Sequence, residues 1–112
     1  MALLIVSAAA SPLFGDFLIE VSVTDTNGAP VSGLKPANFQ IAHLASLNHA
    51  AANPRPVKSA DEAPAGFYIL QLKTNKVQPT LPTGHYVLAV AVVKGKGGAS
   101  DQGQTVAVGD IV

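Results

Sequence analysis

"PAGFYILQL" at residues 64–72 and "PTGHYVLAV" at residues 82–90 follow nearly the same pattern. Each reads Pro-x-Gly-x-Tyr-apolar-Leu and stands at the start of an apolar alternation. Proline and glycine favour a turn, and tyrosine followed by alternating apolar residues is typical of a strand whose alternate side chains share one face. The two stretches therefore predict two strands, opened by Tyr68 and Tyr86, each entered through a tight turn.

The same period of two recurs along the chain. In "FLIEVSVTD", Phe17, Ile19, Val21 and Val23 share one face, and the segment ends before Asn-Gly, a pair suited to a tight turn. Seven strands are expected near residues 2–9, 16–25, 37–44, 56–60, 66–73, 85–94 and 103–109. A short helical turn is expected at Pro36, and a brief helix over residues 44–52 is an alternative for the alanine-rich segment.

The connection at residues 73–82 is too long for a two-residue hairpin. It either crosses from one sheet to another or forms a wide hairpin within one sheet. Leu81, Gly84 and Tyr86 resemble the tyrosine corner of immunoglobulin-like domains, in which a tyrosine bonds back to the preceding turn. With the strand count, this predicts an all-β fold, an immunoglobulin-like antiparallel β-sandwich.

A wider resemblance spans roughly residues 17–108 and rests on "VSVTDTNGAPV", "GFYILQL", "GHYVLAVAV" and "GQTVAV". This pattern is similar to bacterial immunoglobulin-like and prealbumin-like modules of the carboxypeptidase regulatory and macroglobulin types. The resemblance implies a spacer, adhesion module or assembly subunit, at an extracellular or cell or particle surface.

Length and composition narrow the class of protein. The 112 residues fit one domain, residues 1–112, and seven basic against seven acidic residues give no field that would gather nucleic acid. Charged residues make up only 12% of the chain, and a sparsely charged, neutral surface tends to associate. Protein partners are therefore expected, either further copies of the chain or neighbouring domains.

The first residues, "MALLIVSAAASP", end in small residues before a proline, but they lack the basic start of a secretory signal. A first strand is the preferred interpretation. No stretch reaches the 18 to 20 apolar residues of a spanning helix. With no cysteine, the fold has neither disulfides nor a thiolate metal site.

No pattern indicates chemistry, and we expect no catalytic, cofactor-binding or metal-ligating residues. His43 and His49 lie six apart and His85 stands alone, which is too few ligands for zinc. The Asp25 segment lacks the alternating acids of a calcium loop and is expected to form a turn. Asp61 and Glu62 would bind a cation only if the fold brought other oxygens to them.

The positive signal is that three expected strands, in "HYVLAVAVV", "FYILQL" and "ALLIV", are apolar on both faces, although a strand with one wet face should alternate apolar with polar. The residues opposite the core face are the predicted interaction surface: Phe67, Ile69, Val87, Ala89, Ala91 and Val93. Alternatively, residues 45–64 or a terminus cover this face. The expected function is a non-catalytic structural or assembly module that associates through apolar sheet faces and strand edges. The alternative is a ligand-binding accessory module, for example for carbohydrate, that uses the end loops.

Overall fold

The computed structural model describes residues 2–13, 16–46, 56–73, 80–95 and 100–111, with the backbone alone at 43–46. Seven strands and one short 3₁₀ helix form within these residues. In chain order they are β1 (Ile5–Leu13), β2 (Asp16–Thr24), η1 (Pro36–Asn38), β3 (Phe39–Ser46), β4 (Val57–Glu62), β5 (Phe67–Leu72), β6 (Gly84–Lys94) and β7 (Asp101–Ile111).

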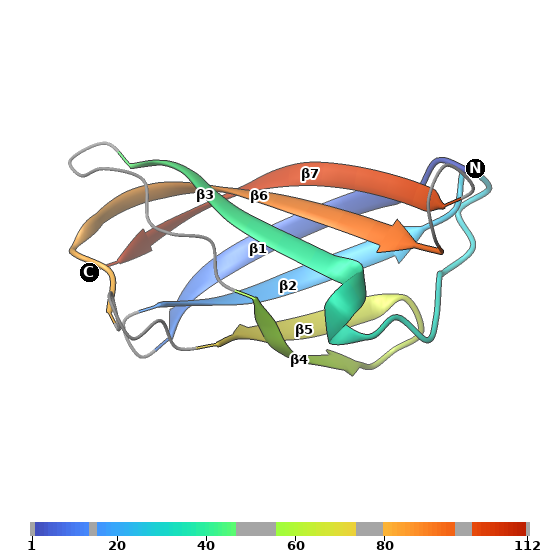
Figure 1. The fold of residues 1–112 in the computed structure, drawn as a ribbon, viewed down its shortest axis with the longest axis horizontal. Helices are drawn as coiled ribbons and strands as arrows, with labels where there is room; N and C mark the ends of the chain where they lie inside the picture. Colours follow the sequence, from blue (N-terminus) through green and yellow to red (C-terminus); the bar gives the residue numbers. More distant parts are fainter. Residues whose placement is uncertain (1, 14–15, 47–55, 74–79, 96–99, 112) are drawn as a thin grey trace.

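The strands form two antiparallel sheets that pack as two layers (Figure 1). One sheet has the order β1-β2-β5-β4 and the other the order β3-β6-β7. This is the strand order of constant-type immunoglobulin domains, in which the first, second, fifth and fourth strands oppose the third, sixth and seventh. The predicted all-β, immunoglobulin-like antiparallel sandwich is confirmed.

The core lies between the layers and is built from the period of two seen in the sequence. In β2 the residues Phe17, Ile19, Val21 and Val23 are buried while Glu20 is exposed. β6 follows the same rule with Tyr86, Leu88, Val90 and Val92. The alternation therefore decides which side chains leave water, and that burial is the main stabilising term of a small domain.

The repeated tyrosine pattern is explained by two equivalent contacts between the sheets. The ring of Tyr68 on β5 meets Phe39 of the other sheet edge-on, with centroids 5.2 Å apart. The ring of Tyr86 on β6 meets Phe17 in the same way at 5.6 Å. Each strand thus places a tyrosine against a phenylalanine of the opposite layer, a favoured aromatic geometry.

Both tyrosine hydroxyls bond to backbone. The Tyr86 hydroxyl donates to the Pro82 carbonyl at 2.7 Å, which confirms the predicted tyrosine corner. The Tyr68 hydroxyl donates to the Val31 carbonyl at 2.7 Å and accepts from the Leu34 N–H at 3.1 Å. A buried tyrosine needs such partners, and here they fix the loop before η1 onto the end of β5.

The two sheets are also joined where β1 begins beside β7 (Figure 1). The Leu4 N–H donates to the Gln102 carbonyl at 2.8 Å, and the Gln102 N–H donates to the Ala2 carbonyl at 3.1 Å. Residues 2–4 therefore form a short parallel extension at the edge of β7 before the chain enters β1 and pairs with β2.

Some sequence-based boundaries need correction. The first strand runs over Ile5–Leu13 rather than residues 2–9, because residues 2–4 pair with β7 instead of β2. The helix suggested over 44–52 is wrong at its start, since residues 44–46 belong to β3, and residues 47–52 lie outside the described residues. The helical turn at Pro36 is confirmed, and the 73–82 connection crosses between sheets.

Candidate interaction surface

The outer face of the β3-β6-β7 sheet is apolar along its central strand. Val87, Ala89, Ala91 and Val93 point away from the core and are half-buried by their lateral neighbours. Ala42 of β3 lies opposite Ala89 in the register and is also half-buried. The four β6 residues predicted for interaction therefore share one face of one sheet.

The neighbouring strand β7 adds two large apolar side chains to this face. Val106 pairs with Ala89 and is 54% exposed, and Val108 pairs with Val87 and is 71% exposed. Between them, Ala107 points into the core and is buried. The strand thus turns its larger residues to the outside and its smaller residue inward, the reverse of an ordinary half-buried strand.

This reversal follows from how closely β1 and β2 approach β7. A Cβ added to Gly103 would lie 2.3 Å from the carbonyl oxygen of Leu4. A Cβ added to Gly109 would lie 2.5 Å from the ring of Phe17. The inner side of β7 near these positions is closed to any side chain, which leaves the outer side for the valines.

A shallow hollow of about 500 Å³ extends this surface toward the N-terminal segment. Its lining includes Ala91 and Val93 of β6, Leu3 and Ile5 near the N-terminus, and polar side chains of β7. Leu3 is 62% exposed and Ile5 is 49% exposed. We call Val87, Ala89, Ala91, Val93, Val106 and Val108 the β6–β7 apolar face, and this hollow continues it.

The predicted interaction residues did not include Val106, Val108, Leu3 or Ile5, although "ALLIV" was expected to be apolar on both faces. The only available signal was that "QTVAVGD" and "ALLIV" are apolar at adjacent positions. That signal does not say which position is inward. The structure therefore makes the candidate surface wider on the β7 side than the sequence suggested.

The other two predicted interaction residues lie elsewhere. Phe67 and Ile69 of β5 face outward from the opposite sheet, where Phe67 pairs with Ser22 and Ile69 with Glu20. Both are half-buried, and a small hollow beside Phe67 is lined partly by serines and Glu20. The six predicted residues therefore do not form one surface, because β5 and β6 belong to different layers of the sandwich.

The histidines are not brought together. His85 lies at one end of the β6–β7 apolar face, and its Nδ1 is 2.5 Å from Oδ1 of Asp110 on the paired strand. The backbone of His43 lies in β3 opposite Leu88, and His49 is outside the described residues. Within the described part of the chain, no three His, Asp or Glu side chains are grouped as metal ligands.

Two of the acidic residues hold turns in place. Asp25 accepts backbone N–H bonds from Asn27 at 2.8 Å and from Ala29 at 3.0 Å, as expected for a turn. Glu62 accepts from the N–H of Gly66 at 2.8 Å and of Gly33 at 3.1 Å. These bonds, with that of Gly66 the stronger cause, hold the pKa of Glu62 below its ordinary value.

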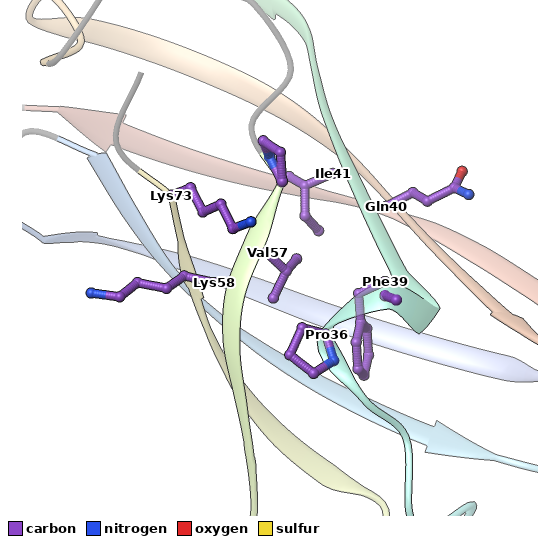
Figure 2. Close-up of a pocket in the computed structure, with 9 residues that line it drawn as sticks. Pro36, Phe39, Gln40, Ile41, Val57, Lys58 and Lys73 are labelled. Atoms are coloured by element: carbon purple, nitrogen blue, oxygen red, sulfur yellow. The ribbon is translucent and has the colours of Figure 1, made fainter. Parts of the chain in front are cut away.

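A second concave site lies between the edge strands β3 and β4, on the side of the sandwich away from β1 and β7. Figure 2 shows this groove, whose volume is about 570 Å³, with Ile41 and Val57 directed into it and Pro36 and Phe39 at one end. Lys73 is also among the lining residues. Phe39, Ile41 and Val57 are buried, so the groove is shallow over a well-packed floor.

Comparisons of the chain with protein-family models, curated protein sequences and solved structures gave no match. Among the described residues, the structure contains no helix with the length and hydropathy needed to cross a bilayer. The surface geometry is therefore the basis for a functional proposal.

Proposed function

We propose that this chain is a non-catalytic assembly module that associates with protein partners, first of all further copies of itself, through the β6–β7 apolar face. The observation that carries this proposal is the exposure of Val106 and Val108 beside the small residues of β6. The roles implied by the family resemblance, spacer or adhesion domain at an extracellular or particle surface, are compatible with such a face.

Three physical properties favour burial of this face. Six apolar side chains are contiguous on two paired strands, and contiguous exposed apolar surface usually marks an interaction site. Charged side chains on the strands lie toward their ends, where His85 pairs with Asp110 and Lys94 with Asp101 in the register. The net charge of the chain is zero, so copies do not repel one another.

The experiment is the molar mass of the purified chain by light scattering across a hundredfold range of concentration, for the wild type and for Ala89→Lys. Ala89 lies at the centre of the face, opposite both Ala42 and Val106. Burying an unpaired ammonium there is strongly unfavourable. We expect the wild type to form oligomers and the variant to remain a monomer.

Ala9→Lys is the matched control, because Ala9 is exposed on β1 and its partner in the register is Glu20. The same change on the opposite sheet should leave association unchanged. A wild type that stays monomeric at every concentration would contradict the proposal. Equal effects of the two lysines would show that general charge, and not this face, controls association.

A ligand-binding accessory role is the second candidate, and the groove between β3 and β4 gives it a location. Its apolar floor and the nearby Lys73 suit an apolar molecule with an acidic group better than they suit a sugar, since Phe39 is buried rather than presented flat to solvent. Titration with dodecanoate and with cellohexaose, followed by amide NMR shifts, tests this role. Saturable shifts confined to Phe39, Ile41 and Val57 would support it.

A further inference from the structure

The edge of β7 that faces away from β6 has a defined pattern of backbone groups. Both the N–H and the C=O of Gln102 bond to residues 2–4, on the side away from β6. The β6–β7 register is regular along the whole strand, and backbone groups alternate in direction from one residue to the next. The N–H and C=O groups of Gln104, Val106, Val108 and Asp110 therefore also point away from β6.

These four residues have no backbone partner on that side among the described residues. Residues 2–4 occupy the edge as far as Gln102. Beyond Gln102 the strand β1 bonds to β2 and lies against the inner side of β7, where Ala10 approaches Gly109. The unpaired edge runs from Gln104 to Asp110. It carries no lysine and no proline, the residues that ordinarily protect an edge strand from pairing with another chain.

We infer that this edge pairs with the same edge of a second copy, in an antiparallel register centred on Ala107. The inference rests on the proposed self-association and adds a second contact between copies, at the strand edge beside the β6–β7 apolar face. In this register Val106 of one copy lies opposite Val108 of the other, and Gln104 lies opposite Asp110. All of these positions point backbone groups toward the partner, so every unpaired group on the edge gains a hydrogen bond.

The side chains of this segment suit pairing with themselves. The two-fold axis brings Val106 and Val108 of both copies together, which extends the apolar face from one sheet to the next. Asp110 meets a neutral glutamine and not a second aspartate, so no like charges are opposed. On the inner side of the paired strands, Thr105 of one copy lies opposite Gly109 of the other, and the two Ala107 residues lie opposite each other. These side chains are small, which suits the side of β7 that β1 approaches. A two-fold pairing of this kind closes on itself, as isologous interfaces do.

Cysteine crosslinking tests the register directly, because the chain has no cysteine of its own. In the proposed register the Cα atoms of Val106 and of the partner's Val108 are about 5.5 Å apart, within the range of a disulfide. Two Val106 positions, or two Val108 positions, are diagonal neighbours at roughly 7–8 Å, too far for one. An equal mixture of Val106→Cys and Val108→Cys chains should therefore give disulfide-linked dimers of mixed composition, and either variant alone should give at least fivefold less.

Two controls accompany the mixture under the same mild oxidation. Ala9→Cys, exposed on β1, measures crosslinking by random collision. Val106→Pro removes an N–H that no strand of the same chain uses, so the fold keeps its ladder while the edge loses a donor. We expect this proline variant to lose the edge-paired dimer and to keep the thermal transition of a folded domain.

The outcomes separate the geometry from the broader proposal. Crosslinking of Val106→Cys alone as efficient as that of the mixture would overturn the Ala107 register. In a second outcome the wild type associates, Ala89→Lys abolishes that association, and the cysteine mixture is no more crosslinked than the Ala9→Cys control. This outcome would overturn edge pairing and leave face burial standing. A monomeric wild type would overturn both.

Discussion

Removal of the Tyr68 hydroxyl tests a polar group that bonds the loop before η1 to β5. In Tyr68→Phe the ring remains, so the edge-on contact with Phe39 is kept. The hydroxyl loses the bond that it donates to the Val31 carbonyl and the one that it accepts from the Leu34 N–H, together with its interaction with Glu62. The change therefore measures chiefly the cost of releasing the loop between β2 and η1.

The magnitude follows from the burial of the two groups left behind. Leu34 is only 6% exposed, and a buried N–H without an acceptor costs about 1–3 kcal/mol. Val31 is half-buried, so its carbonyl can accept a hydrogen bond from water in the variant. Loss of its bond to Tyr68 therefore costs about 1 kcal/mol of unfolding free energy. The expected loss is about 2–4 kcal/mol of unfolding free energy, a large share of the roughly 5–15 kcal/mol typical of a domain.

Tyr86→Phe provides the comparison, because its hydroxyl bond runs to the carbonyl of the exposed Pro82. That change should cost about 1 kcal/mol. Urea unfolding followed by far-UV circular dichroism measures both, and the midpoint for Tyr68→Phe should fall by roughly 1–2 M with an unchanged slope. Equal losses for the two variants, or a Tyr68→Phe midpoint within error of the wild type, would refute the assignment of the Tyr68 hydroxyl as the main tie of this loop.

Three further predictions use the same unfolding assay. The N–H partners of Glu62 lower its pKa, so the bonds of its carboxylate stabilise the fold above the ordinary carboxyl pKa and are lost as pH falls through the lowered value. Glu62→Gln should therefore flatten the dependence of unfolding free energy on pH below about pH 4.3. An unchanged dependence would contradict the role of these N–H bonds. Burial, together with Glu62, raises the pKa of Tyr68, so stability should fall as pH rises above about 10, and Tyr68→Phe should remove that part of the decline. Gly66→Ala should destabilise the fold more than Gly28→Ala, because both glycines have positive φ but only at Gly66 would a Cβ meet Pro30, at 2.6 Å. Gly28→Ala should cost about 1–2 kcal/mol from its backbone conformation alone. Equal losses for the two variants would argue against the clash at Gly66.

The groove between β3 and β4 and the β6–β7 apolar face differ in what they present to a partner. The groove between β3 and β4 has a floor of side chains that are already nearly buried, such as Ile41 and Val57. The β6–β7 apolar face has side chains that keep half or more of their surface in water, such as Val106 and Val108. Burial of apolar surface is favourable in proportion to the area removed from water, so association on the second region has more to gain.

The sequence by itself determined the strands, most of their limits and the core of the sandwich. Period-two alternation and turn residues are local properties, and they sufficed to place Tyr68 and Tyr86 at strand starts and to predict the corner bond of Tyr86. The turn at Asp25 was also local, since its carboxylate bonds only to neighbouring N–H groups.

Tertiary structure alone decided which apolar positions reach water. Phe67 and Val87 look equivalent in the repeated pattern, yet they lie on opposite outer faces because the chain crosses between sheets after β5. Val106 and Val108 point outward because Leu4 and Phe17, far away in the sequence, close the inner side of β7 at Gly103 and Gly109. The physical reason is that alternation sets two faces for each strand, whereas packing against distant segments decides which of the two is buried.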